Sequence, residues 1–346
     1  MKEQKASNNH LSDTPIPERI TPVSEVDPQQ TSEIVRPIVR EAGFVAQVPE
    51  PCEQKSDKGA DSIPLQGIAT QGQGQRMTTQ QLITIQDALS MRDKAVLDTL
   101  KKYRFLLSKQ VQRFIFYDGK TDWGNFVACN RTLNRLQELG MVDTLKRRIG
   151  GVRAGSSGKV WYLTNAGHRL LHLNDPHKYS RKRPKEPSTL FLNHILAVAE
   201  TAVQLTLLCR DSHDLSLDQL DAEPPCWRPF NDSGRIIQLK PDLFAVTTYS
   251  NYEDRWFVEV DLGTESPAQI VSKCNVYLNY YYTGIEQRET KMFPFVLWIV
   301  PDQNRKKRLK EYIKENIKDQ PKMFLIITPN ELENVLRQWI GREELC

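Results

Sequence analysis

Three acidic residues stand close together in the stretch from residue 239 to residue 282. Asp242 opens one apolar segment, and Glu259 and Asp261 lie at the end of a second one, RWFVEVDLG. Successive side chains of a strand point to opposite faces, so Glu259 and Asp261 are expected to share a face. Burying a carboxylate is costly unless it is paired or binds a metal ion. These acids therefore indicate a chemical site.

A helix is predicted to follow the second strand, over about residues 267–282. Its expected core-facing residues recur at three- and four-residue steps, and they are Ile270, Cys274, Tyr277 and Tyr281. Lys273 lies beside this stripe, where its ammonium could reach the carboxylates. Carboxylates suit Mg²⁺ or Mn²⁺, and a nearby ammonium could position a water or stabilise charge on a phosphate. The predicted catalytic residues are Asp242, Glu259, Asp261 and Lys273, with Asp242, Glu259 and Asp261 as metal ligands.

The pattern of Pro241-Asp242, Glu259-Val260-Asp261 and Lys273 resembles the PD-(D/E)xK phosphodiesterase fold. Asp261 stands at the usual lysine position, and Lys273 on the next helix is the candidate for a lysine that has moved. More narrowly, PDLF, FVEVDLGTES and KCNVYLNYY resemble the replication-relaxation family of plasmids and other mobile elements. That resemblance extends from about residue 92 to the C-terminus. It implies a winged-helix domain followed by a nuclease-like domain.

Length and composition allow two domains and an unstructured segment, since the chain has 346 residues of which 39% are hydrophobic. Residues 1–76 contain eight prolines and one aromatic residue, Phe44, which cannot offset the entropy of ordering. The expected division is a disordered tail (1–77), a winged helix-turn-helix domain (78–176), a basic linker (177–187) and a PD-(D/E)xK-like domain (188–346). The predicted class is α/β, α+β overall, with a mixed central sheet.

The cellular compartment is predicted from cysteines and hydropathy. The six cysteines are scattered without metal-ligand spacing, as is typical of reduced thiols in a cytosolic protein. No apolar run reaches about 18 residues, and the first residues lack a signal-peptide core. We therefore expect a cytoplasmic, DNA-associated bacterial protein without a membrane segment.

Three helices and a hairpin are predicted in the winged-helix segment. The first helix is predicted over about 91–106, and the second over about 108–116 with Ser108 as its cap. The third lies within 125–142 and ends at Gly140. Strands at 142–148 and 159–163 then flank a glycine-rich loop. This order is that of a winged helix, whose third helix enters the major groove while its wing reaches backbone phosphates.

Charge supports a polyanionic partner for this segment. Residues 91–185 contain 21 Lys and Arg against seven Asp and Glu, a net charge of +14, while the whole chain carries +4. We expect double-stranded DNA as the partner and, by analogy with winged-helix proteins on palindromic sites, a homodimer. A winged helix that serves only protein interaction is the alternative. The predicted DNA-binding residues are Asn130, Arg131, Asn134, Arg135, Lys146, Arg147, Arg148, Arg153 and Lys159.

The second domain is expected to begin with a helix near residue 188 and to end with alternating strands and helices. Glu200 on that helix is either an accessory carboxylate of the site or a surface residue. His194 is interpreted as structural, because a lone histidine has no second metal ligand at a suitable spacing. The continuous apolar run FPFVLWIV predicts a central strand covered on both faces. Tyr280, Tyr281 and Tyr282 are interpreted as packing residues.

Three functions remain open. The first is a DNA-binding protein of a plasmid or other mobile element, acting in replication, relaxation or transfer on a nuclease-like scaffold. The second is an active Mg²⁺- or Mn²⁺-dependent endonuclease. The third is a non-enzymatic transcription or assembly factor that docks a replication or transfer protein, which a third helix buried against the second domain would favour. The sequence contains no GxxxxGK[ST], HExxH or GxSxG motif.

Overall fold

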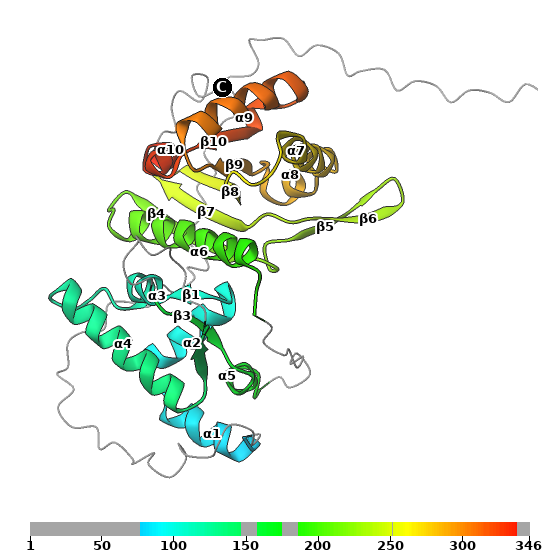
Figure 1. Cartoon of the computed structure of the whole chain (residues 1–346). Coiled ribbons are helices and arrows are strands. Elements are labelled where there is room, and N and C mark those ends of the chain that lie inside the picture. Colours follow the sequence, from blue (N-terminus) through cyan, green and yellow to red (C-terminus); the bar gives the residue numbers. More distant parts are fainter. Residues whose placement is uncertain (1–76, 147–157, 175–185, 251, 338–346) are drawn as a thin grey trace, which may run out of the picture. The chain divides into compact units, whose positions relative to one another are not determined.

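Residues 77–146, 158–174, 186–250 and 252–337 are described by the structure, a computed structural model. These residues all belong to one compact unit. The fold is mixed α/β, as predicted (Figure 1). The predicted tail, the tip of the wing and most of the basic linker lie outside the described residues. Arg147, Arg148 and Arg153 are among the positions outside them.

The N-terminal part, residues 77–174, combines helices with a small antiparallel sheet in which β3 lies between β1 and β2. The strand β1 was not predicted, nor were the helices α1 and α5. The elements are α1 (Thr79–Ala88), α2 (Met91–Tyr103), β1 (Leu106–Leu107), α3 (Ser108–Ile115), α4 (Asp122–Glu138), β2 (Val142–Thr144), β3 (Val160–Leu163) and α5 (Asn165–Leu170).

Local hydrogen bonds set the ends of these helices. Ser90 begins α2, because its hydroxyl accepts from the backbone of Asp93 and the Asp93 carboxylate accepts from the Ser90 backbone. Gly140, with φ of 71°, follows the end of α4 as predicted. The start of α4 lies at Asp122, about three residues before the predicted one, because the Thr121 hydroxyl caps it by accepting from Gly124 N.

The predicted cap of α3 is wrong by one residue. Leu107 occupies the N-cap position, and its backbone N–H donates to the Gln110 side chain at 3.0 Å. Ser108 is the first helical residue, and its buried hydroxyl accepts from Trp161 Nε1 of β3 at 2.9 Å. A buried indole N–H needs an acceptor, so this serine serves the core of the small sheet.

The C-terminal part, residues 186–337, is built around a five-stranded sheet of order β10-β9-β8-β7-β4. Its β8, β9 and β10 are parallel, while β7 and β4 are antiparallel to their neighbours, which confirms the predicted mixed sheet. The elements are α6 (Thr189–Arg210), β4 (Leu215–Ala222), β5 (Arg228–Asp232), β6 (Arg235–Leu239), β7 (Leu243–Tyr249), β8 (Tyr252–Val260), α7 (Pro267–Tyr282), α8 (Ile285–Thr290), β9 (Phe295–Ile299), α9 (Gln303–Asn316), β10 (Phe324–Ile327) and α10 (Leu332–Arg337).

Helices cover both faces of this sheet, with α6 on one face and α7 and α9 on the other (Figure 1). Along β8, Trp256 and Val258 pack in the core that contains α6 and α10, whereas Phe257 packs in the core formed with α7 and α9. This is the alternation expected of a strand. The strand β9 lies between β8 and β10, so the apolar run FPFVLWIV is a central strand as predicted. Glu259 therefore lies on the side of α7.

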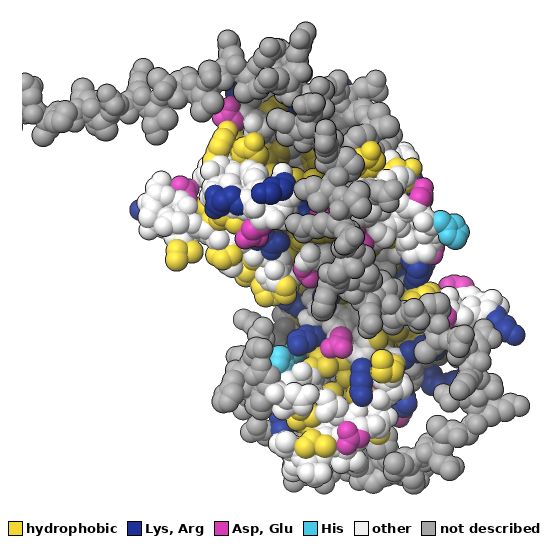
Figure 2. All heavy atoms as spheres, turned by 180° about the vertical axis from the view of Figure 1, so that it is seen from behind, with side chains coloured by type: hydrophobic (Ala, Val, Ile, Leu, Met, Phe, Trp, Pro, Cys, Tyr) yellow, Lys and Arg dark blue, Asp and Glu magenta, His cyan; other side chains and the backbone are white. Residues whose placement is uncertain are grey.

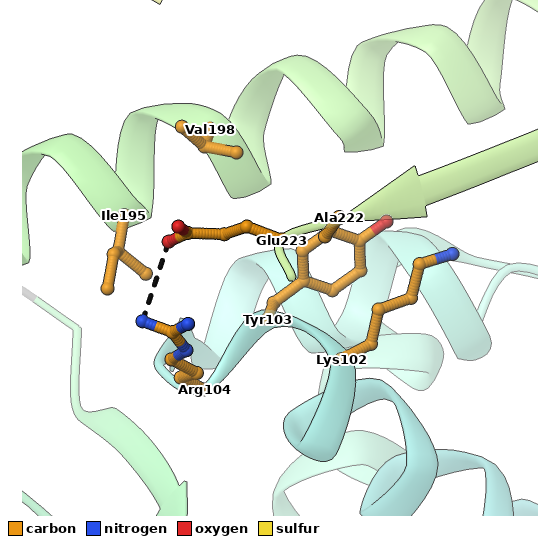
Figure 3. A pocket seen from close by; sticks show the side chains of 7 residues that line it. All are labelled: Lys102, Tyr103, Arg104, Ile195, Val198, Ala222 and Glu223. Atoms are coloured by element: carbon orange, nitrogen blue, oxygen red, sulfur yellow. Dashed lines mark ion pairs between the residues drawn. The ribbon is translucent and has the colours of Figure 1, made fainter. Parts of the chain in front are cut away.

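The helix α6 joins the two parts. It packs against α3 and β4, and Gln110 Nε2 of α3 donates to the Leu196 carbonyl at 2.9 Å. Figure 3 shows a second junction, where Arg104 faces Glu223 beside Ile195 of α6, with 3.4 Å between the charged atoms. The predicted recognition helix α4 instead packs mainly against α3 and β2. The burial that would favour the assembly-factor alternative is therefore not observed.

By length and composition alone, α6 is also apolar enough to cross a membrane. Half of its most apolar window is buried inside the fold, where Ala199, Ala202 and Val203 are fully enclosed. Apolar residues on several sides of a helix are also expected when it lies between two packed layers. We interpret α6 as such a core helix.

Candidate functional site

Asp242 joins three elements at one end of the sheet. It directly precedes β7, and its Oδ2 accepts from Val260 N at the end of β8 at 2.8 Å. Its Oδ1 lies 2.9 Å from Nε2 of His194 on α6. The antiparallel pairing of β7 with β8 brings the start of one strand to the end of the other. The predicted meeting of Asp242 with the end of β8 is thus present.

Glu259 is deeply buried, with 2% of its surface exposed. The Tyr277 hydroxyl donates to its Oε1 at 2.6 Å, and Lys273 Nζ lies 3.4 Å from its Oε2. Burial, followed by the charge of Asp242, raises the pKa of Glu259 to about 8 although Lys273 and Tyr277 act to lower it. A carboxylate held in this way resists ionising at neutral pH.

Lys273 reaches the site from the middle of α7, as the sequence predicts. Besides Glu259 it contacts Glu265, whose Oε1 lies 2.8 Å from its Nζ. Burial alone would lower the pKa of Lys273, but the charge of Glu259 and the contact with Glu265 outweigh burial and raise it. The other carboxylate oxygen of Glu265 is buried and takes no hydrogen bond from the described part of the chain.

Asp261 is engaged elsewhere. Its Oδ2 lies 2.6 Å from Arg305 Nε on α9, and its Oδ1 accepts from Gly263 N at 2.9 Å. Within the described ranges no set of three or more His, Cys, Asp and Glu side chains is arranged to hold a metal ion. The structure therefore brings Asp242, Glu259 and Lys273 together and gives Asp261 an arginine partner.

His194 belongs to the same constellation, although its sequence context indicated a structural role. It lines a cavity of about 420 Å³ together with residues of α6 and of the β8–α7 loop. The hydrogen bond to Asp242, which outweighs burial, raises the pKa of His194. No local motif could reveal it, because its partner lies 48 positions along the chain. The other cavity-lining residues are Leu190, Asn193, Leu262, Thr264 and Glu265.

Glu200 lies two turns further along α6 and serves the junction between the two parts. Its Oε1 pairs with Arg113 of α3, and its Oε2 accepts from Gln110 Nε2 at 3.2 Å. An accessory carboxylate would have to face Asp242 instead. Of the two alternatives for Glu200, these contacts match neither an accessory carboxylate of the site nor an unpaired surface residue.

Two carboxylates are sufficient for the cation that the resemblance implies. Mg²⁺ is commonly held by one or two carboxylates together with waters and substrate phosphates. Asp242 and Glu259 supply such oxygens at adjoining strand ends, and a cation between them would remove the penalty that now raises the pKa of Glu259. The residues present thus fit a hard divalent cation.

The predicted DNA-binding residues have different surroundings. On α4, Arg131 and Asn134 are exposed, while Asn130 donates to the Phe126 carbonyl of its own helix at 3.1 Å. Arg135 pairs with Asp93, whose side chain is fully buried. At the base of the wing, Lys146 is exposed and Lys159 lies over the ring of Trp161, 5.5 Å from its centre. Arg135 therefore has a structural partner, whereas Arg131 and Asn134 are available to a ligand.

Basic side chains are dispersed on the face that Figure 2 shows, where Lys and Arg are interspersed with apolar and neutral side chains. On α9, Arg305 and Lys306 are engaged with Asp261 and Glu331. The surface charge on this face therefore does not define a path along which a polyanion would bind. The expectation of a polyanionic partner rests on the net positive charge of residues 91–185.

Comparison with known proteins places the chain in a family. The model of the replication-relaxation family matches residues 97–296. This range includes α3 and α4 as well as Asp242, Glu259 and Lys273. No match was found among curated proteins or among solved structures. Because the match covers more than half of the sequence, the chain belongs to the replication-relaxation family.

Proposed function

We propose that this protein binds double-stranded DNA of a mobile element through its N-terminal part and cleaves a DNA strand through its C-terminal part. Family membership indicates a role in replication or relaxation of mobile elements. The finer proposal is a winged helix coupled to a PD-(D/E)xK-like, Mg²⁺- or Mn²⁺-dependent endonuclease. A cut in one strand is the chemical step by which a supercoiled molecule can relax.

The observation that carries the proposal is the environment of Glu259. Its carboxylate is buried, faces the charge of Asp242 and has a pKa raised to about 8. A structural glutamate gains nothing from such a position, since a neutral residue would fit there at lower cost. In a site that binds a metal cation, by contrast, the buried carboxylate serves as a ligand. A strongly perturbed carboxylate that lies beside a second acid and a lysine is typical of functional sites.

Each residue has a defined role in this proposal. Asp242 and Glu259 would hold the cation, which when bound supplies charge stabilisation and a more acidic water. Tyr277 fixes one oxygen of Glu259 by its hydrogen bond at 2.6 Å. Lys273 offers an ammonium for the negative charge that develops on the phosphate. His194 orients the Asp242 carboxylate from the opposite side of the sheet, at 2.9 Å.

DNA binding is supported by the order of elements and by charge. The N-terminal part has α2, β1, α3, α4 and a β2–β3 hairpin, with β3 between the other two strands. This is the order of a winged helix-turn-helix domain, in which α4 would be the recognition helix. The net charge of +14 over residues 91–185 suits a phosphate backbone. Arg131 and Asn134 would face the bases.

A second candidate is a DNA-binding replication factor that no longer cleaves DNA. The specific observation in its favour is Asp261, which stands at the usual lysine position of the resembling nucleases and is neutralised by Arg305 at 2.6 Å. With an acid at this position, the only ammonium beside Glu259 among the described residues is that of Lys273, at 3.4 Å. The second candidate requires that Lys273 does not replace the missing lysine in catalysis.

Cleavage of supercoiled plasmid DNA by the full-length protein separates the two candidates. The plasmid should carry the replication or transfer region of the element, and Mg²⁺, Mn²⁺ and a chelator should be compared. The variants are Asp242→Asn, Glu259→Gln and Lys273→Met. Glu253→Gln, an exposed acid on the same strand β8, is the matched control.

Metal-dependent nicking that is lost in the three site variants and kept in Glu253→Gln is the expected result. Each site variant should still bind the plasmid in a mobility-shift assay, because the site lies outside α4 and the wing. Tight DNA binding by the wild-type protein without nicking under any metal condition would favour the second candidate. The absence of both binding and nicking would reject the proposal.

A further inference from the structure

The first half of α4 exposes three apolar side chains on neighbouring turns. Trp123 is 72% exposed, Phe126 36% and Val127 38%. Residues three and four apart on a helix are neighbours, so these side chains form one surface, which we call the α4 apolar patch. The rings of Trp123 and Phe126 are in contact, with centroids 5.6 Å apart. Exposing a tryptophan to this extent is costly unless it meets a ligand.

Hydrogen bonds hold the start of α4 and thereby the patch. Gly119 N donates to Asn125 Oδ1 at 2.9 Å, which ties the preceding loop to the helix. The Gln112 side chain of α3 donates to the Asp122 carboxylate at 2.6 Å. Asp118 in the loop pairs with Arg92 of α2. The patch is thus presented by a fixed helix, which reduces the entropy cost of binding.

The patch continues along the helix into polar residues. Arg131 follows Val127 by one turn, and Asn134 follows Arg131 by one turn, both exposed. The opposite side of α4 is the buried one, where Cys129, Leu133 and Leu136 are fully enclosed. One exposed side of α4 is therefore apolar at its start and polar towards its end.

Charge identifies the occupant of this surface. The patch lies within the segment of residues 91–185, which carries a net charge of +14. A second copy of the chain would bring the same charge to the contact and would be repelled, whereas DNA is attracted. The start of a recognition helix contacts base edges in the major groove. The apolar group that base edges present there is the C5-methyl of thymine.

We propose that the α4 apolar patch recognises thymine methyl groups in the major groove and makes Trp123 a determinant of sequence specificity. The inference rests on the proposed binding of duplex DNA and deepens it. Trp123 and Val127 bury methyl groups near the start of α4, while Arg131 and Asn134 hydrogen-bond to the neighbouring base pairs. The preferred site therefore contains thymines at fixed positions on one side of those base pairs.

Uracil in place of thymine removes only the methyl group, so it tests this proposal directly. Duplexes that bind the full-length protein would first be selected from a pool of randomised 30-base-pair duplexes. The most enriched duplex would then be synthesised with thymine or with deoxyuridine. We expect about fourfold weaker binding for each methyl group lost, the ratio that burial of one such group provides. Trp123→Ala should bring the two affinities closer together by weakening binding to the thymine duplex, and Val127 should retain part of the difference. Met91→Ala, which removes an even more exposed apolar residue from α2, should behave as the wild-type protein.

Equal binding of the thymine and uracil duplexes by the wild-type protein would overturn the inference while leaving duplex binding intact. An equal loss on both duplexes in Trp123→Ala would overturn it as well. Sedimentation of the same proteins tests whether a second copy of the chain occupies the patch instead. A wild-type dimer that Trp123→Ala dissociates would make the patch a protein interface and would overturn the inference. A wild-type protein that binds no duplex at all would reject this inference together with the proposed function.

Discussion

Arg305 Nε lies 2.6 Å from Asp261 Oδ2, and the two side chains are 10% and 0% exposed. Arg305 also donates to the Glu265 carbonyl at 2.6 Å, so this arginine ties α9 to the loop that follows β8. A buried ion pair contributes little net stability, but removing one partner leaves an uncompensated charge. In the structure Asp261, which the sequence assigned to the site, is thus paired with an arginine of α9.

Arg305→Met should lower the free energy of unfolding by about 3–5 kcal/mol, because it leaves Asp261 buried without its partner. Adding Asp261→Asn to that variant should restore most of the loss. Urea unfolding of the single and double variants measures both effects, and Arg308→Met on an exposed turn of α9 is the control. A single variant as stable as the wild type would contradict the structural role.

The raised pKa of Glu259 predicts how stability depends on pH. The carboxyl ionises near its ordinary pKa of 4.5 in the unfolded chain and near 8 in the folded one. Between these values the unfolded state binds fewer protons, so stability should fall as pH rises from about 4.5 to about 8. Glu259→Gln removes this dependence and should be more stable than the wild type at pH 8, by on the order of 4 kcal/mol. Metal-free urea unfolding at several pH values tests it, and parallel curves for the two proteins would contradict the prediction.

Cation binding should release a proton from the same carboxyl. At pH 7 Glu259 is mostly protonated, since its pKa lies near 8, and a cation requires its charged form. Calorimetric titration with Mg²⁺ in buffers of different ionisation enthalpy counts that proton. Glu259→Gln should bind Mg²⁺ weakly and release none, whereas Glu253→Gln should match the wild type. Binding without proton release in the wild-type protein would place the cation elsewhere.

Sequence patterns predicted the buried faces and the bounds of helices and strands better than they predicted the polar partners of individual side chains. The bounds of α7 and the alternation along β8 follow from local periodicity, and so Glu259 and Lys273 were predicted to approach each other. Within α7 the same reasoning chose Tyr281 for the core, and the structure packs Tyr281 half-buried against it. The reasoning missed the more deeply buried Tyr280, whose hydroxyl donates to the buried Glu286 at 2.9 Å. A local pattern does not contain the polar partner that selects between adjacent tyrosines.

Pairings between distant segments could not be predicted for the same reason. His194 meets Asp242 across 48 positions, and Arg305 meets Asp261 across 44. Which helix lies opposite a strand end depends on the whole topology, and many charged residues compete for each acid. The site could thus be located from the sequence, while the assignment of Asp261 to it and the structural interpretation of His194 depended on contacts that only the fold defines.

The two arginines of α4 provide the last prediction, because the structure gives them different roles. Asp93 accepts from Ser90 N at 2.9 Å with Oδ2, and its buried Oδ1 pairs with Arg135. Arg135→Ala should therefore lower the free energy of unfolding by about 1–3 kcal/mol, the cost of leaving a buried acceptor without its donor. Arg131→Ala should leave stability unchanged but reduce the preference for the selected duplex over a random one by about 10-fold, as expected for one lost base contact. Thermal unfolding and competition binding on both variants distinguish the roles. If Arg135→Ala lost sequence preference with full stability, Arg135 would contact the bases as well as Arg131, and the ion pair with Asp93 would have to open on binding.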